Sequence, residues 1–128
     1  MAWTFEQGTG RLLSQDGSLL TTGYSGAVGY KNNPRMQDVK GKGPIPQGTY
    51  TIEAPRDTPD HGPEAMPLAP DSENEMFGRL GFWIHGDSMH APGTASEGCV
   101  ILPRFARERV WQSGDHTLRV VREVLTIV

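Results

Sequence analysis

The sequence contains a single cysteine, Cys99, among its 128 residues. One thiol excludes an internal disulfide and any zinc site built on several cysteines. Two interpretations of Cys99 remain. It is either a small buried hydrophobic side chain or a reactive group.

The chain also lacks an excess of positive charge and any long apolar run. Twelve Lys and Arg stand against 15 Asp and Glu, a net charge of −3 at pH 7, so nucleic acid is not expected as a partner. No apolar run approaches the roughly 20 residues that span a bilayer. The segment Met1–Glu6 has neither the basic nor the apolar part of a signal peptide, so we expect no routing through general export.

Glycine and proline, in contrast, are abundant. The 16 Gly and 10 Pro indicate many short strands joined by turns rather than a helix bundle. The length fits one domain over residues 1–128. We therefore predict a mainly β, β-rich α+β fold in a single domain.

Alternation and turn residues place the predicted elements. Asp16-Gly17 predicts a hairpin between two of the strands, and Pro103 and Gly114 bound one helix over 103–113. Leu102, Ala106 and Val110 give that helix an apolar stripe. The predicted strands are 3–7, 11–14, 18–22, 49–53, 79–85 and 117–128, the last either bent or split in two.

Two segments are predicted as loops. Residues 23–44 look like a surface excursion with one helical turn after Pro34. Residues 55–75 carry five prolines and scattered acids, which predicts a long loop. That loop is either a lid or cleft wall, or a plain surface insertion.

Cys99 and His85 are the candidate catalytic pair, and each lies beside a glycine. Gly98 precedes the thiol, and Gly86 follows the histidine at the end of a predicted buried strand. Glycine permits a sharp turn and close approach of a ligand, and a backbone N–H at such a turn can face an oxyanion. A thiol needs a base or a positive neighbour to become a nucleophile, and His85 can supply one. A buried structural Cys and a structural His remain the alternative interpretation.

Other titratable groups offer weaker alternatives. His90 is a rival base, whereas His61 is expected in solvent and His116 in a structural role. A metal site from His85, Asp87 and His90 is not expected, because this spacing does not place ligands on one helix face.

Arg104 is the remaining charged candidate. It lies one helical turn after the thiol, where it either binds a substrate carboxylate or simply faces solvent.

The sequence around these residues resembles the L,D-transpeptidase catalytic domain. The shared features are Ile84-His85-Gly86, Ser96-x-Gly98-Cys99 and the upstream segment 43–52. A closer and nearly end-to-end resemblance is to type VI secretion effectors of L,D-transpeptidase type. It is carried by 3–13, 31–38, 74–79, 85–88 and 92–99.

The resemblance implies an L,D-transpeptidase-like β-sandwich or barrel, with one helix after the cysteine and long loops forming a cleft. It implies an antibacterial toxin that acts in the periplasm of a target cell. The activity would be L,D-carboxypeptidase cleavage of peptidoglycan stem tetrapeptides, with D-amino-acid exchange and no cofactor. A cognate immunity protein and a carrier on the secretion machine are the implied partners, and a monomer is the simplest state.

The resemblance also implies the site residues. The catalytic set is Cys99, His85, Ser96, Gly98 and Gly86, with Ser96 tying the turn before the thiol. The Gly86 carbonyl or Ser88 would fix the tautomer of His85. The candidate substrate-binding residues are Arg104, Glu97, Ser88 and Asp87.

Two positions depart from the general signature. Glu97 replaces a second histidine, in agreement with the effector pattern, and Ile101 replaces an Asn or Arg. A non-catalytic peptidoglycan-binding or inhibitor module is the alternative function. Fast alkylation below the free-thiol pKa of roughly 8.5 would favour the enzyme. A papain-like endopeptidase fits poorly, because those enzymes usually place Cys before His.

Overall fold

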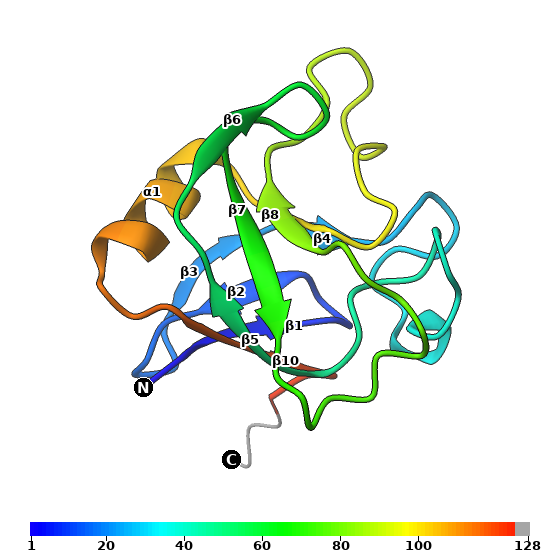
Figure 1. Cartoon of the computed structure of the whole chain (residues 1–128), viewed down its shortest axis with the longest axis horizontal. Helices are drawn as coiled ribbons and strands as arrows, with labels where there is room; N and C mark the ends of the chain where they lie inside the picture. Colours follow the sequence, from blue (N-terminus) through cyan, green and yellow to red (C-terminus); the bar gives the residue numbers. More distant parts are fainter. Residues whose placement is uncertain (125–128) are drawn as a thin grey trace.

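A computed structural model describes residues 1–124 and is built mainly from short strands. Figure 1 shows them with the single α-helix on one side, beside β7. The strands are β1 (Trp3–Glu6), β2 (Arg11–Leu13), β3 (Leu19–Thr22), β4 (Tyr24–Ser25), β5 (Gly48–Ile52), β6 (Arg56–Thr58), β7 (Gly62–Pro70), β8 (Trp83–His85), β9 (Val100–Ile101) and β10 (Thr117–Val121). The helices are the 3-10 turn η1 (Pro34–Met36) and α1 (Arg104–Gln112).

The strands form one mixed sheet in the order β3-β2-β1-β10-β5-β7-β8-β9-β4, with β6 paired to β7. The pairs β1–β10 and β8–β9 are parallel, and the others are antiparallel. This confirms the predicted β-rich α+β class. The sheet is not closed into a barrel, so the barrel form of the prediction is wrong.

The predicted helix is confirmed. It follows Pro103 and ends before Gly114, whose φ of 76° suits glycine. Ala106 and Val110 are buried on its inner face, and Leu102 just before it is buried in the same core. Within residues 1–124, no helix has the length and apolar character needed to cross a bilayer.

The amino-terminal hairpin is also confirmed. Strands β2 and β3 pair antiparallel around Gly17, which has φ of 85°. Strand β10 matches the first part of the predicted strand 117–128, of which residues 125–128 lie outside the described residues.

The prediction of a long loop over 55–75 is wrong, because β6 and the nine-residue β7 lie inside it. Its prolines misled the prediction, since proline cannot donate to a sheet. Pro67 is tolerated because it lies opposite the end of β5, where the sheet requires no N–H donor from it. It has no N–H to donate there, and its carbonyl accepts from the N–H of Glu53 at 2.9 Å. On its other side Pro67 is in register with Trp83 of β8, and Leu68 beyond it pairs with Ile52 of β5.

Two further boundaries differ from prediction. The strand expected over 79–85 covers only Trp83–His85, because Arg79 closes a turn by donating its N–H to Met76. The segment 23–44 does contain the expected helical turn, Pro34–Met36. It also contains β4, which pairs with β9 directly after the cysteine.

Candidate active site

Cys99 and His85 line the same cleft, which has a volume of about 750 Å³. Strand β8 ends at His85, and β9 begins directly after Cys99. The two strands pair in parallel, with Ile84 opposite Val100. Sheet pairing therefore brings together the thiol and the imidazole that the sequence singles out.

His85 is held in one tautomer. Its side chain is buried at 6% exposure, and its Nδ1 lies 2.8 Å from the carbonyl oxygen of Gly86. A carbonyl only accepts, so Nδ1 carries the proton and Nε2 of the neutral ring is left as a base. Burial lowers the pKa of His85, which favours this neutral form.

Cys99 is partly buried, and burial raises the pKa of its thiol to about 11. The nearby carboxylate of Glu97 raises that pKa further, whereas the N–H of Trp83 and the charge of Arg79 lower it. Both shifts favour the uncharged forms, a protonated thiol and a neutral imidazole, in the same cleft.

Ser96 organises the turn that carries the cysteine. Its hydroxyl donates to the carbonyl of Cys99 at 2.6 Å and accepts from the N–H groups of Gly98 at 3.0 Å and Gly26 at 2.9 Å. The residue is 1% exposed, and the two bonds that its hydroxyl accepts are buried, whereas the bond to the Cys99 carbonyl is partly buried. One hydroxyl thus joins the cysteine turn to the segment after β4, and it occupies the Gly98 N–H.

Arg79 supports the same turn from behind and was not recognised in the sequence. It is buried at 7% exposure and donates to four backbone carbonyls, those of Gln37, Gly43, Pro44 and Glu97. Gly98 has φ of 144°, and a Cβ there would lie 2.6 Å from Nη2 of Arg79. Only glycine fits between this guanidinium and the turn.

Gly86 is restricted in a similar way on the histidine side. A Cβ at Gly86 would lie 2.9 Å from Nη1 of Arg107. Arg107 is 4% exposed and donates from that nitrogen to the carbonyl of Leu102 at 2.6 Å. A second buried guanidinium therefore lies against the glycine that orients His85.

Comparison with known proteins identifies the family of this chain. A model of the Tlde1 domain matches residues 20–125. The chain belongs to the Tlde1 domain family. No curated protein and no solved structure gave a match. The family indicates a type VI secretion effector, with the secretion machine and a cognate immunity protein as its expected partners.

In this Tlde1 domain, Asp87 and Ser88 lie beside the site and are not among the residues of 1–124 that line the cleft. The Asp87 carboxylate accepts from the hydroxyl of Tyr24 at 2.6 Å and from the N–H of Gly93 at 3.0 Å. The Ser88 hydroxyl accepts from the N–H of Ala91 at 3.0 Å. Both side chains hold the loop after β8, and it is the Gly86 carbonyl that contacts Nδ1 of His85.

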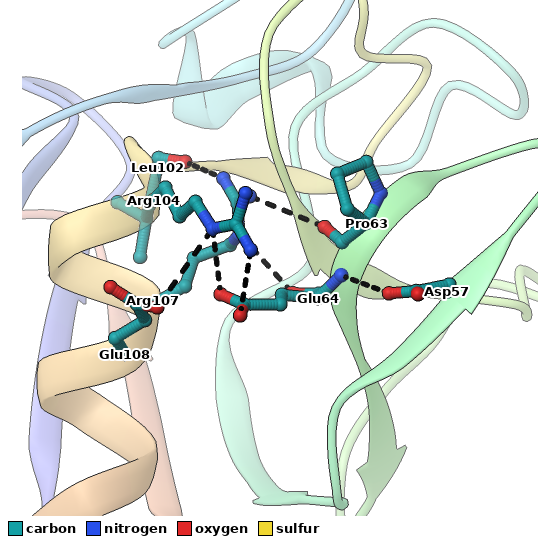
Figure 2. A network of polar contacts seen from close by, with 7 residues as sticks. All are labelled: Asp57, Pro63, Glu64, Leu102, Arg104, Arg107 and Glu108. Carbon is teal, nitrogen blue, oxygen red and sulfur yellow. Dashed lines mark hydrogen bonds and ion pairs between the residues drawn. The ribbon is translucent and has the colours of Figure 1, made fainter.

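Arg104 also lies outside the described lining of the cleft. Figure 2 shows it paired with Glu64 at 3.0 Å and with Glu108 at 3.8 Å. The expected contact with a substrate carboxylate is therefore not supported, since Glu64 already neutralises the guanidinium. Glu97, in contrast, does line the cleft.

Besides Arg79, two further cleft residues were missed. His61 was expected in solvent, but its ring stacks on those of His85 and Trp83. Lys40 also lines the cleft, near Gly78. Neither has a sequence signal, because each lies in a segment predicted as loop. The rival base, His90, is exposed and is not part of the lining that residues 1–124 provide.

Proposed function

We propose that this Tlde1 domain is a cysteine L,D-carboxypeptidase that removes the terminal D-Ala of peptidoglycan stem tetrapeptides. Exchange of that D-Ala for another D-amino acid is the second branch of the reaction. The observation that carries the proposal is the opening of one thiol and one oriented imidazole into the same cleft. The sequence resemblance supports the choice of substrate.

The first step follows from the protonation states. Nε2 of His85 takes the proton of the Cys99 thiol as the sulfur attacks the carbonyl carbon at the L-centre of meso-diaminopimelate. The carbonyl π electrons move to oxygen and give a tetrahedral oxyanion. Because both pKa shifts favour the neutral pair, we assign this transfer to the substrate-bound state.

The second step releases the amino acid. The oxyanion re-forms the carbonyl, the C–N bond breaks, and protonated His85 gives its proton to the departing amine of D-Ala. A thioester remains on Cys99. Water, deprotonated by His85, then yields the tripeptide carboxyl group and the free thiol, whereas the amine of a D-amino acid yields the exchanged tetrapeptide.

The backbone of the cysteine turn stabilises the oxyanion. The Gly98 N–H already donates to Ser96, so the N–H of Cys99 is the donor that we assign to the oxyanion. One such donor contributes roughly 3 kcal/mol to the transition state. The Ser96 bond to the Cys99 carbonyl keeps this peptide group oriented.

The substrate carboxylate requires a cation, and we assign Lys40. The arginine and lysine of the described cleft wall are Arg79 and Lys40. Both terminal nitrogens of Arg79 donate to backbone carbonyls. Lys40→Met should therefore raise KM for tetrapeptide about tenfold. Lys42→Met is the matched control, since Lys42 lies over the ring of Tyr30.

The decisive experiment uses a disaccharide-tetrapeptide, with products followed by mass spectrometry. Wild type should form tripeptide, Cys99→Ala should form none with its fold intact, and His85→Ala should be slower by orders of magnitude. His90→Ala is the matched control and should keep the wild-type rate. Near-normal turnover by His85→Ala together with loss in His90→Ala would reverse the base assignment.

The setting of the reaction is proposed from the same resemblance. The producer cell would deliver the domain through the type VI system into the periplasm of a rival cell, where peptidoglycan lies. The cognate immunity protein would protect the producer. Expression of the domain directed to the periplasm should lyse cells, and Cys99→Ala should abolish lysis.

A non-catalytic peptidoglycan-binding module is the second candidate. The raised pKa of Cys99 favours it, because a protonated, partly buried thiol is a poor nucleophile by itself. The same pKa removes fast alkylation as a distinguishing property, since the free enzyme would also alkylate slowly at neutral pH. Unchanged tetrapeptide, together with saturable binding of it, would favour the binding module.

A further inference from the structure

His61 lies over the proposed base. The hairpin of β6 and β7 carries it to the cleft, where its ring stacks on His85 with centroids 5.1 Å apart and planes inclined by 29°. It also contacts the ring of Trp83, with a centroid distance of 4.6 Å. Neither the sequence motifs nor the family match assigns it a role.

The contact complements the hydrogen bond that Gly86 makes. The Gly86 carbonyl holds one edge of the His85 ring at Nδ1, but rotation of the ring about its Cβ–Cγ bond would break this hydrogen bond and move Nε2. A ring stacked on one face opposes this rotation. The charged groups that bear on His85 are Arg107 of α1, Asp87 of the following loop and His61 of the hairpin, with the Cys99 thiol in the same cleft.

The hairpin is itself anchored to the helix through Glu64, as Figure 2 shows. Arg104 donates two hydrogen bonds to the Glu64 carboxylate, at 3.0 and 3.2 Å. Arg107 donates to the carbonyls of Glu64 and Pro63 at 3.2 and 3.3 Å. On the strand side, the Glu64 N–H donates to Asp57 at 3.1 Å.

Backbone conformation is consistent with a fixed hairpin. Glu64 has φ of 52° and Gly62 has φ of 78°, so two residues within three positions adopt left-handed geometry. A non-glycine residue holds such a conformation when its surroundings determine it. The network around Glu64 supplies those surroundings, three residues beyond His61.

We infer that His61 is a positioning residue, which holds the His85 ring by stacking so that Nε2 stays directed into the cleft. The Glu64 network sets the position of His61 by anchoring the hairpin to α1. The function of Arg104 is then to fix this hairpin rather than to bind substrate. The catalytic consequence rests on the proposed function, whereas the geometric claim does not.

The geometric claim is tested by NMR of the imidazole nitrogens in the unliganded protein. Wild type should show a single His85 tautomer protonated at Nδ1. His61→Ala should show a mixture of tautomers or exchange broadening, and His61→Phe, which retains an aromatic ring, should restore the single form. His90→Ala is the control and should match wild type. A single unbroadened tautomer in His61→Ala would overturn the inference.

The catalytic consequence is tested on tetrapeptide cleavage. His61→Ala should lower kcat about tenfold with little change in KM, and His61→Phe should recover most of the loss. His61 lowers the pKa of His85 in addition to burial, the main cause, so His61→Phe should move the acid limb of kcat/KM to higher pH. An unchanged kcat in His61→Ala would overturn positioning. Lack of cleavage by wild type would overturn the proposed function and leave the NMR result to decide the geometry.

Discussion

The cysteine side and the histidine side of the cleft are supported by the same device. On each side a buried arginine donates to backbone carbonyls behind a glycine, Arg79 behind Gly98 and Arg107 behind Gly86. The surroundings differ. The cysteine turn is further fixed by the interior hydroxyl of Ser96, whereas the histidine side depends on a hairpin held by a partly exposed ion pair.

This difference indicates how the two groups are controlled. The position of Cys99 is determined by interior hydrogen bonds, whose replacement by water is not possible without unfolding the turn. The position of His85 depends in addition on contacts at the surface, which are weaker and more open to change. We therefore expect substitutions on the cysteine side to lower stability more than those on the histidine side, and substitutions in the hairpin to act mainly on rate.

Replacement of the two arginines should give the largest effects. Two carbonyls that Arg79 satisfies are fully buried, compared with one for Arg107. Each buried acceptor left unpaired costs about 1–3 kcal/mol. Arg79→Met should lower the free energy of unfolding by about 4 kcal/mol and Arg107→Met by about 2 kcal/mol. Urea denaturation measures both, and equal losses would contradict the proposed difference between the sides.

Gly98→Ala should follow in size. The new methyl group would lie 2.6 Å from Arg79 and 2.9 Å from Phe82, in addition to the backbone strain at φ of 144°. We expect a loss of about 3 kcal/mol and of all activity. Gly17→Ala is the matched control, because it has φ of 85° and nothing within 4 Å of the new methyl group. A loss as large in Gly17→Ala would show that strain alone is responsible.

The pH dependence of activity and stability should report the pKa of His85. Burial lowers the pKa of His85 below its ordinary 6.5, so the neutral base persists below that pH. The acid limb of kcat/KM should therefore lie below pH 6.5. The free energy of unfolding should also rise with pH in this range. The reason is that His85 binds its proton near pH 6.5 in the unfolded chain but only at lower pH in the folded protein.

The stability from His85 is thus present above pH 6.5 and is lost as pH falls toward the folded pKa. Comparison of wild type with His85→Gln by urea denaturation at several pH values isolates this contribution. We expect the stability of His85→Gln relative to wild type to be higher at pH 5 than at pH 7. An unchanged difference would show that the histidine titrates normally.

Arg104→Ala should have the smallest effect on the free energy of unfolding and on KM. Its ion pair with Glu64 is exposed, and such pairs contribute little to stability. KM for tetrapeptide should stay unchanged, because the guanidinium lies outside the described cleft wall. A severalfold rise in KM would return Arg104 to the substrate-binding role that the sequence first offered.

Much of the fold could be predicted because the signals were local. The β2–β3 hairpin follows from Asp16-Gly17, and the helix from Pro103, Gly114 and an apolar stripe. The strand β7 could not be predicted, since its prolines contradict strand propensity. Only the register shows that Pro67 lies where no ladder donor is required.

The site divides in the same way. Cys99, His85, Gly98, Gly86 and Ser96 are recognisable from sequence because each lies in a short motif. His61 and Lys40 reach the cleft from segments without such motifs. Arg79 ends the segment 74–79, but nothing in that segment indicates its contacts with the cysteine turn, and no spacing relates the three residues to Cys99.

The sequence by itself determined the strand-rich class, the single helix and the pair of Cys99 and His85, because these depend on nearest neighbours in the chain. Tertiary structure alone decided what surrounds that pair. Parallel pairing of β8 with β9 joins the two motifs, and burial sets the neutral thiol and imidazole. The hairpin brings His61 over His85, a contact between segments that lie far apart in the chain.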